Sequence, residues 1–267
     1  MAISEDLSTF AYEVYAVKYA ERDGVRGEHF LDGDPHEDDP MPMDYFVWAI
    51  VGGGRTWVVD TGFGQRDADA RGRRLLRSAA DGLALIGVDA ELASDVIITH
   101  LHYDHVGGFD QFPGARFHVQ DREVAYATGR HMTTRALNHA FTSQHIADFV
   151  LAVHAGRVVF HDGDAQLAPG LTVHHVGGHT DGLQIVRVHT VKGWLVLASD
   201  ASHFYENMDA VRPFPIVFHI GDMLDGYRRM RELAGADELI VPGHDPEVLK
   251  RFPPVSADLD GIACRLA

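Results

Sequence analysis

The sequence predicts an α/β domain, and three observations lead to this prediction. Short apolar runs that are typical of strands alternate along the chain with stretches that have helical spacing. A length of 267 residues is long for one small domain and short for two. No low-complexity linker or change in composition divides the chain. We therefore expect one domain over residues 1–267, with loop insertions near residues 22–43 and 129–150.

The first elements are expected to be a surface loop and a β-hairpin. Residues 22–43 are rich in Asp, Gly, Pro, Glu and His, a composition that favours a loop. Two short apolar runs follow at residues 45–51 and 56–59, and the glycines at 52–54 separate them. Strand-like runs on either side of a glycine turn predict a hairpin.

Helices and further strands are expected after the hairpin. Apolar residues from 75 to 83 follow helical spacing, and Asp121 is placed to cap another helix. Residues 130–150 begin polar and become apolar, so we expect helix and loop there that could cover a cleft. A last helix is predicted at residues 221–234, with its apolar residues on one face. Strands are expected at residues 96–98, 117–119, 158–160, 172–175, 184–188, 194–198 and 239–241.

The acidic composition of the chain excludes two classes of partner. Its formal charge is −16, whereas proteins that bind nucleic acids or anionic membranes need a basic surface. No run of about eighteen apolar residues is present, so no membrane span is expected, and the first ten residues do not resemble a secretory signal. We therefore expect a cytoplasmic protein that acts on a small molecule. The loop-rich N-terminal region could form the contact of a homodimer.

A dense group of metal-ligand side chains follows the strand predicted at residues 96–98. His100, His102, Asp104 and His105 lie within six residues, directly after the strand, where a turn can direct them into one cavity. A lone histidine is usually structural, but four ligand residues at this density are not well explained in that way. The only cysteine is Cys264, so a zinc–thiolate cluster is excluded and any metal site must use His, Asp or Glu.

Three further residues extend this group. His179 lies in Gly-Gly-His-Thr, Asp200 follows a strand, and His244 lies in Pro-Gly-His after another strand. Each has an ordinary alternative explanation, because Gly-His turns are common and Asp often ends a strand. Their occurrence together, in this order, favours a metal site.

The combined pattern resembles the metallo-β-lactamase superfamily. The residues that carry the resemblance are His-x-His-x-Asp-His, then Gly-His-Thr, a strand-end Asp and Gly-His, with Val-Asp-Thr-Gly upstream at residues 59–62. The resemblance covers roughly residues 45–245. It implies an αβ/βα sandwich of four layers, in which two mixed β-sheets pack together with helices outside and the site lies at one edge.

The resemblance also implies a role for each ligand residue. His100, His102 and His179 correspond to ligands of a first divalent metal, and Asp104, His105 and His244 to ligands of a second. Asp200 corresponds to the carboxylate that bridges them, and Asp60 to a carboxylate that orients the imidazoles from below. We expect both ions to be Zn²⁺. Flavo-diiron relatives usually carry Glu where His102 stands and need a flavodoxin domain, and this chain shows neither.

Within the superfamily the chain is most similar to the N-acyl-homoserine lactonase-like group. Gly-His-Thr-Asp-Gly-Leu-Gln at residues 178–184 resembles that group's Gly-His-Thr-Pro-Gly-x-Gln, with Asp181 in place of Pro. Such lactonases often carry a Tyr three residues after the bridging Asp, where it contacts the substrate carbonyl. This chain has His203 there, and Tyr205 two residues later. His203 could act in the same place, because imidazole titrates near neutral pH, or it could be an ordinary loop histidine.

The implied reaction is the opening of a lactone ring, of an N-acyl-homoserine lactone or a related small lactone. A hydroxide shared by two metals would attack the carbonyl, the first metal would stabilise the oxyanion, and the second would hold the leaving ring oxygen. Asp104, helped by His203 or Tyr205, would manage the proton. The alternatives are a two-metal hydrolase of a thioester, cyclic amide or phosphoester, a single-iron persulfide dioxygenase, and a non-catalytic binding module.

Two segments are expected to shape the substrate pocket, namely residues 24–43 and 129–150. The side chains that could line an apolar wall are Met41, Met43, Phe141 and Phe149, and ordinary core packing is the alternative for Phe149.

Overall fold

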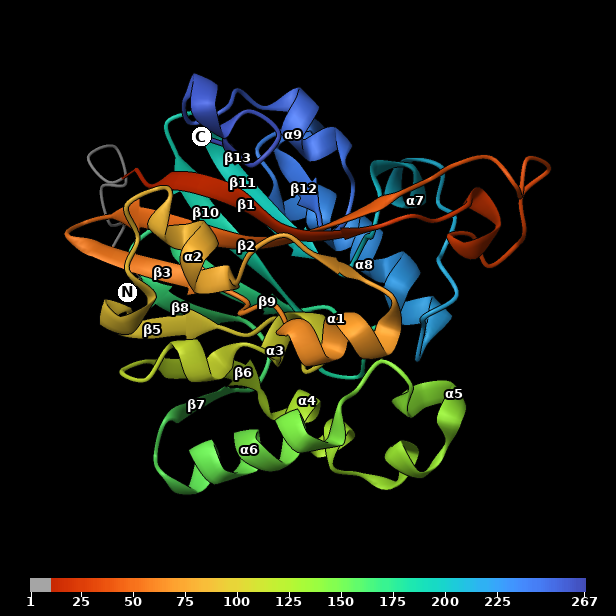
Figure 1. Ribbon diagram of the computed structural model, residues 1–267, viewed down its shortest axis with the longest axis horizontal. Helices are drawn as coiled ribbons and strands as arrows, with labels where there is room; N and C mark the ends of the chain where they lie inside the picture. The colour runs from red at the N-terminus through yellow and green to blue at the C-terminus, as the bar shows by residue number, and fades with distance from the viewer. Residues whose placement is uncertain (1–10) are drawn as a thin grey trace.

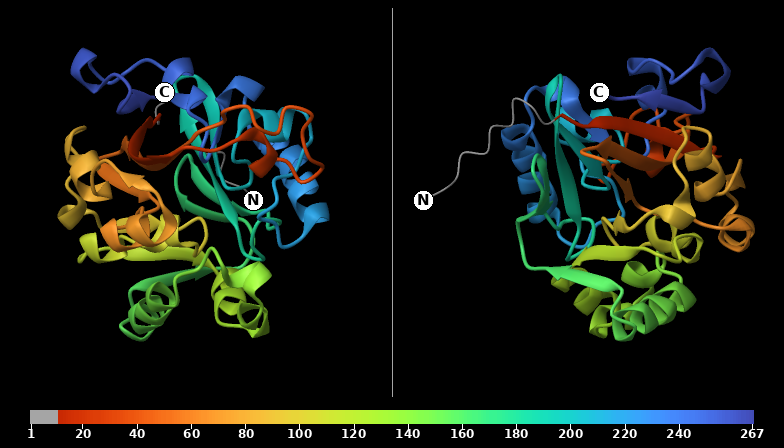
Figure 2. Two further views of the ribbon diagram at one scale, coloured as in Figure 1. Left: turned by 45° about the vertical axis from the view of Figure 1, so that its right-hand side comes forward. Right: turned by 90° about the vertical axis from the view of Figure 1, so that its left-hand side faces the viewer.

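A computed structural model describes residues 11–267, and in it two β-sheets pack against each other with helices on their outer faces (Figure 1). This is the four-layer αβ/βα arrangement that the resemblance implied. Figure 2 shows the layers from two further sides, with α8 against the second sheet and most of the short helices against the first. Within these residues, no helix is both long and apolar enough to cross a membrane.

The first sheet contains eight strands within the described residues, in the order β13-β1-β2-β3-β5-β6-β7, with β4 paired to β1. The pairs β13–β1, β1–β2 and β2–β3 are antiparallel, whereas β3, β5, β6 and β7 run parallel to one another. The bounds are β1 Glu13–Arg22, β2 Met43–Gly52, β3 Arg55–Val59, β4 Arg74–Leu75, β5 Asp95–Ile97, β6 Arg116–Gln120, β7 Val158–His161 and β13 Ala263–Arg265.

The second sheet contains five strands in the described part of the chain, in the order β12-β11-β10-β9-β8. Only the β11–β12 pair is parallel in this sheet, and the other neighbours are antiparallel. The bounds are β8 Ala165–Ala168, β9 Leu171–His175, β10 Gln184–Thr190, β11 Gly193–Ser199 and β12 Ile240–Pro242.

The helices are mostly short and lie in the connections between strands (Figure 1). The α-helices are α1 Gln65–Arg71, α2 Ala79–Ala84, α3 Tyr103–Val106, α4 Asp121–Ala127, α5 Arg135–Asn138, α6 Ser143–His154, α7 Tyr205–Asp209, α8 Ile220–Leu233 and α9 Glu247–Arg251. The 3₁₀ helices are η2 Arg26–Glu28, η3 Ala90–Leu92, η4 Phe109–Gln111, η5 Arg130–Thr133, η6 Asp237–Leu239 and η7 Ala257–Leu259.

Strand β2 shows how the apolar core divides into two parts. Because successive side chains of a strand point to opposite faces, a strand covered on both sides is apolar throughout. Trp48 packs in the cluster that includes Leu197 of the second sheet. Its neighbour Val47 packs in the other cluster, with Ala68 of α1 and Phe149 of α6. The first sheet is therefore held between the second sheet and its own helices.

Most predicted elements are confirmed, with two corrections. Residues 74–75 form β4 and pair with β1, so the helix expected over 75–83 begins only at Ala79. Leu75 of β4 and Ala79 and Leu83 of α2 all pack in the same core cluster, whereas Leu76 is exposed. Asp121 is the first residue of α4 rather than its cap, and Gln120 precedes it without a side-chain capping bond.

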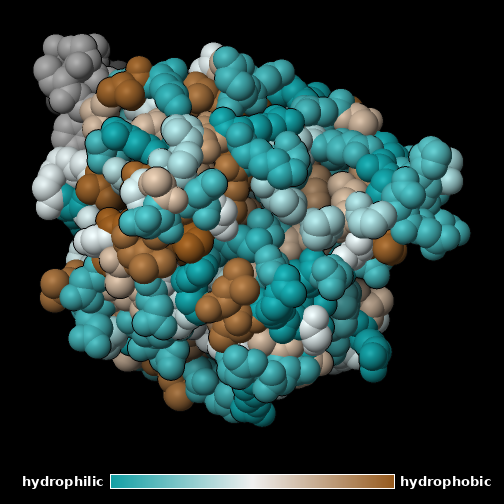
Figure 3. Space-filling view, turned by 45° about the horizontal axis from the view of Figure 1, so that its top comes forward, coloured by the Kyte–Doolittle hydropathy of each residue, from teal (hydrophilic) through white to brown (hydrophobic). Residues whose placement is uncertain are grey.

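The two expected loop insertions lie at the upper right and along the bottom of the molecule as drawn in Figure 1. Residues 23–42 project beyond the sheets, and residues 129–150 lie beneath β6 and β7 around α5 and α6. The space-filling view in Figure 3 shows mostly hydrophilic residues over the projecting end and small scattered apolar groups elsewhere on that face. Arg26 bonds to Asp34 and to Glu206 of α7, which attaches the projecting loop to the rest of the fold.

Candidate metal centre

The seven predicted ligand residues come together at the edge where the carboxyl ends of strands from both sheets meet. His100 follows β5, His179 lies between β9 and β10, Asp200 follows β11, and His244 follows β12. Parallel neighbouring strands end at the same edge of a sheet, so residues distant in sequence become neighbours there. All seven are buried, which means that the fold withdraws a large set of polar side chains from solvent at one place.

Three imidazoles form the first group. The ring nitrogens His100 Nε2 and His102 Nδ1 are 3.1 Å apart, and His179 Nε2 lies 2.9 Å from His102 Nδ1 and 3.2 Å from His100 Nε2. Three nitrogens that face one another in this way cannot all be satisfied by mutual hydrogen bonds, because each neutral ring has one donor and one acceptor. A cation between them would satisfy all three, and imidazole nitrogen is a common ligand of Zn²⁺.

Asp104, His105 and His244 form the second group, and Asp200 lies between the two groups. The carboxylate of Asp104 is 3.7 Å from His105 Nε2 and 3.8 Å from His244 Nε2. Asp200 Oδ1 lies 3.3 Å from His105 Nε2 and 3.1 Å from His244 Nε2, while its Oδ2 lies 3.3 Å from His179 Nε2. One carboxylate oxygen therefore faces each group, the position that a bridging ligand needs.

The imidazoles are oriented by hydrogen bonds made on the side away from the centre. A ligand histidine commonly donates its second ring nitrogen to an acceptor of the protein, which sets its tautomer and orientation. Here the Nδ1 atoms of three ligands do so, with His105 bonded to Asp60 Oδ2 at 2.8 Å, His179 to the Ile216 carbonyl at 2.6 Å and His244 to the Asp44 carbonyl at 2.9 Å.

Thr99 sets the orientation and tautomer of His100 in a similar way. Its hydroxyl donates to Asp60 Oδ2 at 2.8 Å, so it must accept from its other neighbours. One of these is His100 Nδ1 at 3.1 Å, which fixes Nδ1 as the protonated nitrogen and leaves Nε2 directed at the centre. Asp60 also accepts from the Thr99 backbone N–H. The position predicted for Asp60, beneath the histidines, is the position that the structure shows.

The donor set fits divalent metal ions. Groups of buried ligand atoms that could hold an ion include His100, His102 and His179, and also Asp104, His105 and His244. Among the described residues, His105 Nε2 and Asp200 Oδ1 are buried side-chain atoms without a hydrogen-bond partner, and both point into the centre. An unsatisfied buried polar atom is unfavourable, and coordination of a cation would satisfy each of them.

The protonation states of the first group and of Asp200 match ligand chemistry. Burial lowers the pKa of His100 and His102 well below the ordinary value, and lowers that of His179 to about 3. Burial alone would raise the pKa of Asp200, but the neighbouring His244 and His105 hold it well below its usual range. Neutral imidazoles and an ionised carboxylate are the forms that bind a metal. In the second group burial alone would lower the pKa of both histidines, but Asp200 and Asp104 outweigh burial and raise the pKa of His105 well above, and that of His244 above, the ordinary value.

Glu123, at the start of α4, is a residue that the sequence analysis missed. Its buried carboxylate accepts from the Leu101 N–H at 2.8 Å, the Thr180 hydroxyl at 2.7 Å and the Gly182 N–H at 3.1 Å. It therefore ties the loop after β5 to the loop that carries His179. Burial raises its pKa to about 7. The sequence around a single Glu near the start of a helix does not indicate that it joins two distant loops.

The two residues expected to help with the proton have different positions. His203 is buried beside the centre, with Nε2 2.9 Å from Asp200 Oδ2, and its ring stacks on Phe214 with centroids 3.5 Å apart. Tyr205 does not line the pocket. Its ring packs in the core between the sheets and under Arg251. The structure thus brings His203 to the site and not Tyr205.

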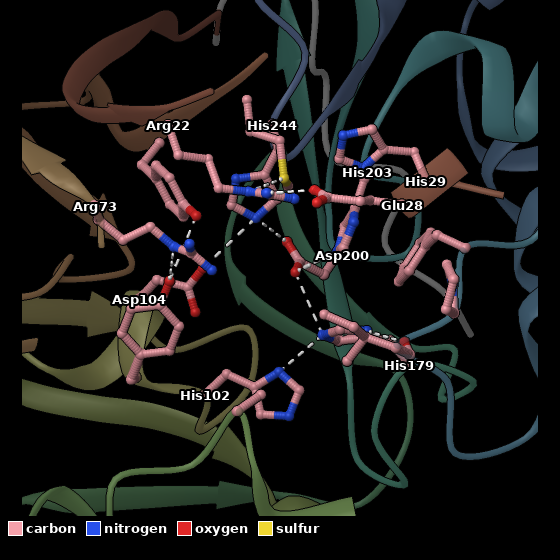
Figure 4. A pocket seen from close by; sticks show the side chains of 17 residues that line it. Arg22, Glu28, His29, Arg73, His102, Asp104, His179, Asp200, His203 and His244 are labelled. Atoms are coloured by element: carbon pink, nitrogen blue, oxygen red, sulfur yellow. Dashed lines mark hydrogen bonds and ion pairs between the residues drawn. The ribbon is translucent and has the colours of Figure 1, made fainter. Parts of the chain in front are cut away.

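A small pocket of about 70 Å³ opens onto the centre (Figure 4). Of the side chains expected to form an apolar wall, only Met43 lines it. Phe141 lies behind the lining, with its ring 4.5 Å from that of His102, and Phe149 packs with Phe117 in the core. The other lining residues are Arg22, Glu28, His29, Tyr45, Arg73, His102, Tyr103, Asp104, Ala140, His179, Asp200, His203, Phe214, Pro215, Ile216 and His244.

Comparisons with known proteins agree with this geometry. The family model of the metallo-beta-lactamase superfamily matches residues 41–244. An N-acyl homoserine lactonase from a Bacillus species is 29% identical over 167 residues, which is 62% of this chain and 61% of the relative. The chain thus spans less than two thirds of the length of that curated relative.

Solved structures show the same fold. A structure of an N-acyl homoserine lactone hydrolase, with the product N-hexanoyl-L-homoserine bound at its catalytic metal center, has a TM-score of 0.75 at 20% identity and covers 90% of this chain and 96% of that one. A dizinc quorum-quenching lactonase has a TM-score of 0.69 at 17% identity, with 88% of each chain covered.

Proposed function

The chain belongs to the metallo-beta-lactamase superfamily, and from this membership we propose that it is a metal-dependent hydrolase that opens the ring of a small lactone. The observation that carries the proposal is the buried set of seven ligand side chains, arranged as two groups with Asp200 between them at the floor of a pocket. Relatives that are named N-acyl homoserine lactonase support the lactone as substrate class.

We propose two divalent cations, both Zn²⁺, as the cofactors. The first would be held by His100, His102 and His179, the second by the group that contains Asp104, and both by Asp200. Bound there, such ions supply Lewis acidity toward a carbonyl oxygen and lower the pKa of water to about 7, which makes hydroxide available at neutral pH.

The side chains around the centre would position the substrate and handle the proton. Asp104 belongs to the second group and also lines the pocket, so its carboxylate can receive the proton of the attacking water and deliver it to the leaving oxygen. His203 lies on the opposite side of Asp200. Burial lowers the pKa of His203 to about 4, so its neutral ring has one N–H, on Nε2, and this N–H donates to the Asp200 carboxylate. His203 would therefore orient Asp200, whereas the Tyr of related lactonases is expected to contact the substrate carbonyl. The stacked ring of Phe214 holds the imidazole of His203 in place.

The position of Asp200 favours this function over a single-iron dioxygenase. A mononuclear site needs one set of ligands, whereas here a second complete group stands on the far side of Asp200. The other two-metal hydrolases, which act on thioesters, cyclic amides or phosphoesters, share the same ligand set and are separated only by the choice of substrate.

The test couples metal content to turnover. His102→Ala and Asp200→Asn are expected to lose bound metal and lactone hydrolysis together while retaining the far-UV circular dichroism of the wild type. His154→Ala, at the exposed end of α6, is the matched control and is expected to retain both. Metal is quantified by elemental analysis, and hydrolysis by proton release on a panel of lactones, thioesters and phosphoesters. Full turnover by metal-free His102→Ala, or one iron per chain in the active protein, would refute the proposal.

A further inference from the structure

Two arginines stand side by side at the mouth of the pocket. Strand β4 pairs with β1 in a register that sets Ala20 opposite Leu75 and Glu21 opposite Arg74. Continued by one residue, this register sets Arg22 opposite Arg73. Both line the pocket, and Figure 4 shows their side chains extending toward its centre from the same side. Like charges on opposite residues of paired strands repel each other, so this arrangement needs a compensating anion.

Arg73 has no such anion in an ion pair. It is half-buried, and its guanidinium is held by two neutral acceptors. Nε donates to the Tyr103 hydroxyl at 3.1 Å, and Nη1 donates to the Arg71 carbonyl at 2.8 Å. Among residues 11–267, no carboxylate forms an ion pair with Arg73, and its Nη2 atom has no hydrogen-bond partner. These contacts fix the plane of the guanidinium and leave one edge free to bind.

Arg22 is held in a similar way. Its Nε donates to the Met43 sulfur at 3.2 Å, and its Nη1 donates to Glu28 at 2.6 Å. The Glu28 side chain is 49% exposed, whereas that of Arg22 is only 16% exposed. The ion pair therefore lies toward the solvent side and orients Arg22 without closing off its second terminal nitrogen, which has no partner in the described part of the chain.

The rest of the pocket supports binding of an anionic group at this place. Phe214, Pro215 and Ile216 form a neutral part of the lining. The carboxylates of the pocket are Glu28, which pairs with Arg22, and Asp104 and Asp200, which belong to the candidate metal centre. The small volume favours a compact substrate. The chain as a whole is strongly acidic, so composition does not explain two arginines that both line the pocket at the metal centre. Guanidinium groups are well suited to bind carboxylate or phosphate through paired N–H donors.

We propose that the natural substrate carries an anionic oxygen group, a carboxylate or a phosphate, that binds between Arg22 and Arg73 while the scissile carbonyl faces the ligand side chains. This inference rests on the proposed hydrolysis and narrows its substrate class to compact, negatively charged lactones or esters. Arg73 acts as the main binding residue, because its charge has no ion-pair partner within the described residues.

The test uses a matched series of γ-lactones on the metal-loaded protein. The series consists of a butyrolactone with a carboxylate substituent, the same ring with a carboxamide, and the same ring with a phosphorylated hydroxymethyl group. The wild type is expected to prefer one of the two anions over the carboxamide by at least about tenfold in kcat/KM, which corresponds to about 1.4 kcal/mol. The preferred anion identifies the group that the arginines bind.

The variants separate a binding role from a structural one. Arg73→Gln is expected to reduce the preference to about twofold or less, through a higher KM for the anionic lactone, while turnover of the carboxamide stays within about twofold of wild type. Arg22→Gln is expected to have the same effect more weakly. Arg74→Gln is the matched control. It removes the same charge at the next residue, whose side chain pairs with Glu21 and does not line the pocket.

Three results would overturn the inference. The first is a wild type that hydrolyses the carboxamide as fast as both anionic lactones. The second is an Arg73→Gln variant that slows all three substrates equally, which would show that Arg73 only balances the charge of Asp104. The third is a preference for the anionic lactone that is unchanged in both arginine variants. Anion binding is also measured without turnover, by calorimetry, as the difference in affinity between the ring-opened hydroxy acid and its amide. Failure of hydrolysis with retained anion binding would refute the proposed function alone, and hydrolysis without anion preference would refute this inference alone.

Discussion

The buried carboxylate of Glu123 is expected to make the free energy of unfolding depend on pH, and Glu123→Gln is expected to remove that dependence. Burial raises the pKa of Glu123 from 4.5 to about 7, although bonds from Thr180, Leu101 and Gly182 oppose the shift. Between these two pH values the folded protein holds one proton more at this position than the unfolded chain does. Stability therefore falls as the pH rises through this interval.

The size of the effect follows from the shift. One pH unit corresponds to about 1.4 kcal/mol, so the interval from 4.5 to about 7 contributes roughly 3 kcal/mol. This stabilisation is fully present below the unfolded pKa and is lost as the pH passes the folded pKa. A glutamine side chain does not titrate. It matches the neutral carboxyl in shape, but its amide has two N–H donors where the carboxyl has one O–H. The test therefore uses the change of the stability difference with pH and not its value at low pH.

The assay is urea-induced unfolding of wild type and Glu123→Gln between about pH 5 and about pH 8.5, at one fixed concentration of free metal. The difference in free energy of unfolding is expected to move toward the variant by roughly 3 kcal/mol across this range. Glu91→Gln, on an exposed side chain, should show a constant difference. A constant difference for Glu123→Gln, or one that moves toward the wild type at high pH, would show that its three hydrogen bonds outweigh burial.

Three further predictions test the surroundings of the centre. Asp60→Asn weakens the hydrogen bond that orients His105 and is expected to lower metal affinity about 10–100-fold, measured by competition with a chelator; unchanged affinity would contradict this. Gly182→Ala would place a Cβ 2.0 Å from the backbone nitrogen of Glu123, and a loss of roughly 1–3 kcal/mol is expected in thermal unfolding. Tyr205→Phe removes a hydroxyl that is buried without a hydrogen-bond partner among the described residues, so stability should be unchanged or higher by up to about 1 kcal/mol, with kcat/KM unaffected.

The candidate ligand residues could be identified from the sequence because their signals are local. Four of them follow one strand, and the other three each follow a further strand, in a fixed order. The hairpin and the central strands were predicted correctly for a related reason, since they are short apolar runs bounded by Gly or Asp. Strand β1 was missed because its buried positions are interrupted by polar residues and by a bulge between Lys18 and Ala20.

The supporting residues could not be predicted, because their roles arise only from tertiary contacts. Glu123 meets Thr180 across 57 positions of the chain. Arg22 and Arg73 become neighbours only through the two-residue strand β4, which propensity alone would assign to a helix. Conversely, Tyr205 is close in sequence to Asp200, but it is the first residue of α7, its N–H donates to Asp245, and its side chain packs in the core between the sheets.

Backbone strain at two strand ends explains how the centre is organised by the fold itself. Asp60 has a φ of 60° and Ser199 a φ of 45°, values that are unfavourable for residues other than glycine and cost on the order of 1–3 kcal/mol each. Asp60 directly follows β3 and its carboxylate accepts from His105, while Ser199 is the last residue of β11 and is followed at once by Asp200. Both side chains contact the hydroxyl of Thr99. Glycine at either position would relieve the strain but would also remove that contact. The strain is therefore tolerated because the same residues that carry it hold the ligands in place.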